Sequence, residues 1–267
     1  YFSHVVAPVG GTILLRSGSS LVVAGDLRLA STAQLNMTGP ASIDGGGGAL
    51  ILQGNLALPG EAITLVNTDW VIDGQGHCVT FNASTIFALG GRTLTLKNMT
   101  IRGLSGSSQF TGVGTLALDN CKIDISAGNT FVYGNADLTI ANDVVVRGGG
   151  RFQFSGLGTM SINLFSTLRV EPQTTFDYAC MTRGSLVMAA PSSTLYLDNC
   201  TLKAQGPEGL ELITGKVIAD GEVTLDNGAN TIKANGIQLG NGVTAVNMLF
   251  KPGARFNVLG QLWYNLP

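Results

Sequence analysis

A six-residue block returns along the chain at a constant interval, and this recurrence limits the fold more than any other feature. The block reads Thr-Leu-Thr-Leu-Lys-Asn at 93–98 and returns in altered form at 115–120, 137–142 and 159–164, so that each copy starts 22 positions after the one before. Three further columns keep the same interval: glycines at Gly90, Gly112, Gly134 and Gly156, asparagines at Asn98, Asn120 and Asn142, and apolar residues at Phe110, Val132, Phe154 and Phe176. A fixed period of about 20 to 50 residues is typical of repeat architectures.

Within each block, apolar residues alternate with polar ones, as in Leu94 and Leu96 or Leu116 and Leu118. Alternation with period two places one set of side chains on one face of a β-strand. Gly, Asn, Asp and Ser separate these short runs and favour turns, and no segment has the apolar spacing of a helix. We therefore predict an all-β parallel solenoid with about three strands per coil, in which equivalent residues of neighbouring coils stack. With one repeat interval per coil, 267 residues give roughly 12 coils in a single domain over 1–267.

The glycine and asparagine columns are predicted to mark turns. Glycine permits a positive φ or a close backbone approach, and stacked asparagine amides can hydrogen-bond along the axis of the solenoid. Two later copies of the block, at 194–199 and 222–227, fall off the interval. Insertions within turns would lengthen those coils without interrupting the stack.

The chain resembles the pectin-lyase-like superfamily of right-handed parallel β-helices. The resemblance rests on Ile-Asp-Gly-Gln-Gly at 72–76 and on Leu-Thr-Leu-Lys-Asn-Met-Thr-Ile at 94–101, and it extends from about Ile13 to Val258. It implies a right-handed, single-stranded β-helix. The superfamily includes pectate lyases, polygalacturonases, phage tailspikes and bacterial surface passenger domains, of which the last are closest in character to this chain.

The enzymes of that superfamily need side chains that this sequence does not supply together. Asn67-Thr68-Asp69 matches one polygalacturonase motif, but the chain has no Asp-Asp pair, no Gly-His-Gly and no Arg-x-Lys. The acidic residues that could hold Ca²⁺ are scattered, whereas Ca²⁺ takes six to eight oxygen ligands; they are Asp119, Asp124, Asp137, Asp143 and Asp177. We predict no catalytic residues, no metal and no cofactor, and we interpret Asn67-Thr68-Asp69 as a turn.

Composition narrows the function classes further. Only 12% of residues are charged and the net charge is −2, so the chain lacks the positive field that nucleic-acid binding requires. No uninterrupted apolar run is long enough to predict a transmembrane helix. Carbohydrate is the alternative ligand, for which Trp70, Tyr196 and Trp263 are isolated aromatic candidates.

The cysteines leave two interpretations open. The numbers of Cys180 and Cys200 differ by nearly one repeat interval, so stacking could bring their Cα atoms within the disulfide range of about 4.4 to 6.8 Å. Burial as reduced thiols in the core is the equal alternative.

Both ends of a solenoid expose unpaired strand edges, which soluble solenoids cover with polar caps. The terminal segments 1–12 and 260–267 are apolar instead, and we expect them to take part in capping or subunit contact. The candidate association residues are Tyr1, Phe2, Val5, Val6, Leu262, Trp263, Tyr264 and Leu266. A heterologous contact between the last coil of one subunit and the first coil of the next would give a filament; flanking domains that supply the caps are the alternative.

The sequence therefore predicts a secreted or cell-surface structural solenoid that associates with itself end to end and is not an enzyme. A polysaccharide-binding or polysaccharide-cleaving β-helix is one alternative. A piece of a passenger or spike protein that acts as an adhesin is the other.

Overall fold

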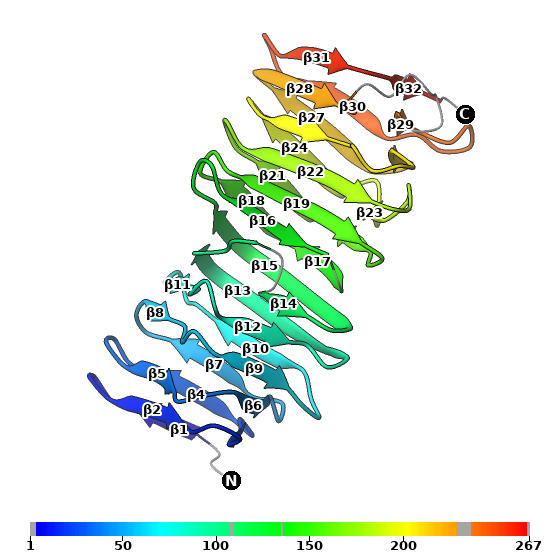
Figure 1. Ribbon diagram of the computed structural model, residues 1–267. Helices are drawn as coiled ribbons and strands as arrows, with labels where there is room; N and C mark the ends of the chain where they lie inside the picture. Colours follow the sequence, from blue (N-terminus) through cyan, green and yellow to red (C-terminus); the bar gives the residue numbers. More distant parts are fainter. Residues whose placement is uncertain (1–3, 107–108, 135, 229–235, 266–267) are drawn as a thin grey trace. The chain divides into compact units, whose positions relative to one another are not determined.

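The protein is described by a computed structural model that covers residues 4–106, 109–134, 136–228 and 236–265. These residues form β-strands and no helix, and the strands stack in parallel as a β-solenoid of about 11 turns, about 23 residues apart (Figure 1). The predicted all-β parallel solenoid is confirmed, and its turns are close in number and length to those expected. No helix able to cross a membrane occurs among the described residues.

Contacts divide the chain into two compact units, 1–124 and 125–267, and each is described by itself. The single-domain interpretation stays a prediction. In both units each turn of the solenoid contributes a strand to three rows, and a strand pairs with the strand one turn earlier and one turn later.

Unit 1 contains strands β1 to β15. Its first row is β1 (His4–Ala7), β4 (Asp26–Leu29), β7 (Ala49–Leu52), β10 (Trp70–Asp73), β13 (Arg92–Arg102) and β15 (Gly114–Asp124). The second row contains β2 (Thr12–Leu15) with β5 (Gln34–Met37), and β8 (Leu56–Ala57) with β11 (Cys78–Thr80) and the second half of β13. The third row is β3 (Ser20–Val22), β6 (Ala41–Asp44), β9 (Ala62–Leu65), β12 (Ile86–Ala88) and β14 (Phe110–Thr111).

Unit 2 contains strands β16 to β32. Its first row contains β17 (Asp137–Ala141), β20 (Met160–Ile162) and β23 (Leu186–Met188), then β26 (Leu210–Leu212), β29 (Ile237–Leu239) and β32 (Leu262–Tyr264). The second row is β18 (Asp143–Arg147), β21 (Thr167–Val170), β24 (Thr194–Asp198), β27 (Lys216–Asp220) and β30 (Asn247–Phe250). The third row is β16 (Thr130–Tyr133), β19 (Arg151–Gly156), β22 (Thr175–Cys180), β25 (Thr201–Lys203), β28 (Glu222–Asp226) and β31 (Arg255–Leu259).

The alternating residues of each strand form apolar ladders inside the solenoid. In unit 1, Leu94 and Leu96 of β13 lie in register with Leu116 and Leu118 of β15, and all four are buried. A fully buried apolar side chain of this size stabilises the fold by about 1.5 to 3 kcal/mol relative to exposure. Because each coil is covered by its neighbours, this burial depends on the stack and not on a single coil.

The third row of unit 2 carries an aromatic ladder. Phe131, Phe152 and Phe176 stack on successive turns with ring centroids 5.6 and 5.7 Å apart. A parallel ladder, with centroids 6.2 and 6.5 Å apart, is formed by Tyr133, Phe154 and Tyr178. Aromatic pairs at such distances add stabilisation beyond the area that they bury.

The apolar column predicted at the constant repeat interval is wrong at Val132. Tyr133, not Val132, pairs with Phe154, and Val132 pairs with Gln153 on the outward face of β16 and β19. The step from Tyr133 to Phe154 is one position shorter than the repeat interval. A shift of one residue moves a strand's side chains to the opposite face.

The later copies of the repeated block lie on different rows. Asp137–Ala141 forms β17 of the first row, whereas Thr194–Asp198 forms β24 of the second row, paired with β21 and β27. Glu222–Asp226 forms β28 of the third row. The block therefore specifies a strand and its turn, and it can occupy any row of the coil.

Candidate functional site

The Asn-Thr-Asp triplet lies in the turn between β9 and β10 and joins three successive turns of unit 1. Asn67 Nδ2 donates to Asp44 Oδ2 at 2.9 Å and Thr68 Oγ1 donates to Asp44 Oδ1 at 2.6 Å. Asp69 Oδ1 accepts from the backbone N–H of Thr93, one turn later, at 2.7 Å. The hydrogen bonds to Asp44, with that from Thr68 first, lower the pKa of this carboxyl. The triplet therefore lies in a turn, as its sequence was interpreted.

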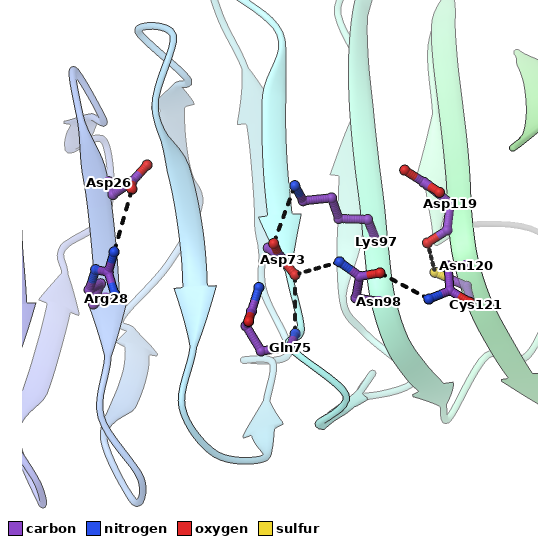
Figure 2. Close-up of polar contacts among 9 residues, drawn as sticks. All are labelled: Asp26, Arg28, Asp73, Gln75, Lys97, Asn98, Asp119, Asn120 and Cys121. Atoms are coloured by element: carbon purple, nitrogen blue, oxygen red, sulfur yellow. Dashed lines mark hydrogen bonds and ion pairs between the residues drawn. The ribbon is translucent and has the colours of Figure 1, made fainter. Parts of the chain in front are cut away.

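A ladder of side-chain amides lies at the corner between the first and second rows of unit 1 (Figure 2). Asn98 Nδ2 donates to Asp73 Oδ1 at 3.2 Å, and Asn98 Oδ1 accepts from Asn120 Nδ2 at 3.0 Å. Asn98 and Asn120 have φ values of 52° and 51°, a left-handed conformation that asparagine adopts more readily than most residues. Asn142, in unit 2, has a φ of 53° and its backbone N–H donates to Ser166 Oγ.

Asp73 is the charged centre of that corner (Figure 2). Burial raises the pKa of Asp73, but donors from the Gln75 backbone, the Asn98 amide and the Lys97 ammonium outweigh it, and the net shift lies below the ordinary 3.8. The Lys97 Nζ to Asp73 Oδ2 distance is 3.2 Å. The arrangement stabilises a carboxylate at the corner between two turns.

The predicted glycine column lies in the corner that follows the third row. Gly90, Gly112 and Gly156 have positive φ, whereas Gly134 does not. Close approach accounts for the pair in unit 2, because a Cβ on Gly156 would lie 1.6 Å from the Gly134 carbonyl oxygen.

Three of the five acidic residues considered for Ca²⁺ take part in separate contacts. Asp124 pairs with Arg102 at 2.9 Å, the buried Asp177 pairs with Arg151, and Asp137 accepts from the Thr159 backbone N–H. In the described residues no group of three or more His, Cys, Asp or Glu side chains is placed to hold a metal ion.

The cysteines are free thiols, and the Cys180–Cys200 disulfide is not formed. Thr175 pairs with Thr201, so one turn of the solenoid contains more residues here than separate Cys180 from Cys200 in the sequence. Cys200 therefore lies beside the start of β22, whereas Cys180 ends that strand opposite Gly156. Both thiols are buried in the core, as the alternative interpretation had it.

Two of the aromatic residues considered for sugar stacking have rings that are covered by other parts of the protein. Trp70 is 1% exposed and points inward, in register with Leu94. Tyr196 faces outward, but the Arg169 guanidinium lies 4.7 Å from its ring centroid and its hydroxyl donates to Asp220 at 2.5 Å. Trp263 is half-buried on the outward side of β32, beside Gln238.

The first turn of unit 1 presents three strand edges. Within the described residues, β1 pairs only with β4, β2 only with β5 and β3 only with β6. An apolar pocket of about 150 Å³ opens at this turn. Its lining residues include Ile13, Leu21, Val22 and Val23. Exposed apolar side chains on the same turn are Val6, Val9, Leu14 and Val22.

The last turn of unit 2 presents three more edges. In the part of the chain that is described, β30 pairs only with β27, β31 only with β28 and β32 only with β29. The exposed apolar side chains here are Leu249, Phe250, Val258, Leu259 and Tyr264. Edges of this kind are templates for pairing with another chain.

The predicted association residues coincide only in part with these two surfaces. Val6 and Tyr264 are exposed and Leu262 and Trp263 are half-buried. Tyr1, Phe2 and Leu266 lie outside the described residues, as does the side chain of Val5. Sequence reasoning missed Leu14, Val22 and most of β30 and β31, because it considered only 1–12 and 260–267. The coil length itself would have extended both segments to a full turn.

Comparison with protein-family models, with curated proteins and with solved structures gives no match for this chain. Membership of the pectin-lyase-like superfamily, and the right-handed winding that it implies, therefore stay predictions.

Proposed function

We propose that the protein is a structural solenoid that associates with itself end to end, so that the last turn of unit 2 in one molecule covers the first turn of unit 1 in the next. One observation carries this proposal: both terminal turns leave three strands with an open edge among the described residues, and both expose apolar side chains beside those edges. A contact between two different surfaces of the same chain yields a filament when its rotation does not close into a ring, and surfaces at opposite ends of a stack of turns favour the filament.

The chemistry of the two surfaces supports this partner. The first turn offers an apolar pocket, and the last turn offers Phe250 and Phe256, which pack edge to face with centroids 4.9 Å apart. A role outside the cell or at its surface, without catalysis, is part of the same proposal. It rests on the low charge of the chain and on the resemblance to surface β-helices.

Light scattering of the purified chain over a range of concentrations tests the proposal, together with negative-stain electron microscopy. We expect a mass that rises with concentration above 27.7 kDa and rods of variable length. A mass that stays at the monomer value at every concentration would overturn the proposal.

Matched variants separate end contacts from general stickiness. Leu14→Lys places a charge on the edge strand β2, and Leu157→Lys places the same charge in a turn of unit 2 between β19 and β20; both leucines are exposed. We expect Phe250→Lys, which puts a charge on the exposed inward side chain of the edge strand β30, to abolish the rods, whereas Leu14→Lys on the outward face of β2 should weaken them and Leu157→Lys should leave them. Equal effects of Phe250→Lys and Leu157→Lys would contradict association through the ends.

A further inference from the structure

We infer that the two ends meet in one defined register, with β1 over β30, β2 over β31 and β3 over β32, so that each residue of these edge strands in the incoming subunit lies beside the residue numbered 243 higher in its neighbour. This inference rests on the proposed end-to-end association and specifies how it occurs. It follows from the order of the strands, from their spacing and from the faces of their side chains.

The order of the strands leaves one arrangement that pairs every edge. Each strand of the last turn lies on the strand three earlier, as β32 lies on β29. The next position on this path is over β30, and an incoming β1 placed there continues the path with β2 over β31 and β3 over β32. Placing β1 over β31 or β32 leaves a gap of one or two strands, each about 4.8 Å deep. Placing β1 over β29 overlaps β32.

The spacing of the edge strands matches this arrangement. β1 starts at His4 and β2 at Thr12, and β30 starts at Asn247 and β31 at Arg255, so the two pairs have the same offset between their first residues. The two intervening turns close with the same backbone hydrogen bond: Gly11 N–H to Pro8 O at 2.8 Å, and Ala254 N–H to Lys251 O at 3.0 Å.

The third pair of strands, β3 over β32, shares fewer residues in register than the other two pairs. The turn between β2 and β3 is 16–19, whereas that between β31 and β32 is 260–261. The common offset of 243 therefore sets Ser20 beside Trp263 and Leu21 beside Tyr264, the last residue of β32.

Side-chain faces agree at the inward positions of this register whose side chains are described. Phe250 and Phe256 continue the inward columns of Ala219 and Val223, and at the offset they meet Ala7 and Ile13. The remaining inward pairs at this offset are Leu15 with Val258 and Leu21 with Tyr264. A slip of one residue would turn one partner outward along every strand.

The pocket on the first turn is placed to accept these aromatic residues. Ile13 and Leu21 line it, and at the offset their neighbours are Phe256 and Tyr264. Burial of these rings would give the terminal turns the two-sided cover that interior turns already have.

Cysteine pairs test the register directly. Val6 and Leu249 face outward, are exposed and differ by 243. Parallel strands bring such residues within about 5 Å, inside the disulfide range of about 4.4 to 6.8 Å. In a Cys78→Ser background, we expect oxidised Val6→Cys/Leu249→Cys protein to give a ladder of covalent oligomers on a non-reducing gel.

A pair from different strands serves as the control. Val6→Cys/Asn257→Cys carries two outward edge residues, but at the offset Asn257 lies beside Leu14, so no ladder is expected beyond the dimers that each single variant forms. The second matched pair, Leu14→Cys/Asn257→Cys, should restore the ladder.

The outcomes separate the two proposals. Rods in the electron microscope without a ladder from either matched pair, or with a ladder from the control pair, would overturn the register and leave end-to-end association in place. A chain that stays monomeric by light scattering would overturn both. Circular dichroism before oxidation verifies that each double variant keeps the wild-type thermal midpoint.

Discussion

Phe152 and Phe256 occupy the same row of unit 2 and both point inward, yet their surroundings differ. Phe152 is 1% exposed and stacks between Phe131 and Phe176 on the turns before and after it. Phe256 lies on β31, which has a strand neighbour on one side among the described residues, and is only half-buried. The comparison shows that a turn of this fold becomes part of a core only when both neighbours are present.

The largest expected effect comes from removing the interior ring. Phe152→Ala should lower the free energy of unfolding by about 3 to 5 kcal/mol, because the cavity lies between rings that cannot collapse into it. Phe256→Ala should lower it by about 1 kcal/mol, since part of the side chain is already exposed. Urea unfolding followed by circular dichroism measures both, at a concentration where the chain is monomeric. Equal losses would refute the distinction between interior and terminal turns.

The second effect concerns a polar column that also needs neighbours on both sides. Asn98→Ala removes amide contacts to Asp73 and Asn120 and leaves alanine at a φ of 52°. We expect a loss of about 2 to 3 kcal/mol in the free energy of unfolding, of which about 1 to 2 kcal/mol is backbone strain and the rest is the hydrogen bonds. Urea unfolding measures this loss as well.

Asn98→Gly separates the two contributions to that loss. Glycine accepts the left-handed conformation without strain, so only the hydrogen-bond part should remain. If both variants lose the same stability, the backbone conformation at Asn98 carries no strain.

The alternation of Leu94 and Leu96 and the asparagine corner were predictable from sequence because both are local. Alternation sets the inward face of a strand, and asparagine tolerates the left-handed turn. Neither depends on the length of the next turn of chain.

The failures arise where turn length changes. A constant interval sets Val132 in one column with Phe154, whereas the step in the third row is one position shorter than that interval from Tyr133 to Phe154 and two positions longer from Phe154 to Tyr178. One extra or missing residue in a corner reverses the face of the following strand, and sequence alone does not reveal which corner absorbs it. The same change of turn length separates Cys180 from Cys200, and of the two interpretations left open for these cysteines the structure shows the reduced, buried thiols.

A smaller effect is expected from acid. The pKa of Asp73 is lowered on folding, so its carboxylate stabilises the protein fully above the ordinary value of 3.8, and this stabilisation is lost as the pH falls through the lowered value. Asp73→Asn should flatten the fall in the free energy of unfolding below about pH 4, by an amount on the order of 1 kcal/mol for hydrogen bonds to a charged group, and thermal unfolding over a series of pH values measures this.

Asp26→Asn is the matched control for that experiment. Asp26 lies on β4, one turn from the edge, and its contact with Arg28 is a 3.9 Å ion pair within its own strand (Figure 2). Exposed ion pairs contribute about 0 to 1 kcal/mol, so the acid response should stay as in the wild type. An equal change in both variants would show that the response does not come from Asp73.

The smallest expected effect concerns the rate at which a reagent modifies each cysteine in the folded protein, which is measured without changing its stability. Burial raises the pKa of Cys121 and Cys200 to about 12 and that of Cys180 to about 11. The thiolate is the reactive form, so at pH 8 iodoacetamide should modify the half-buried Cys78 and spare the other three until the protein is unfolded. Mass spectrometry of peptides after timed labelling identifies each site. Rapid modification of Cys180 in the native protein would mean that the turns around β22 open, which the comparison between interior and terminal turns does not allow.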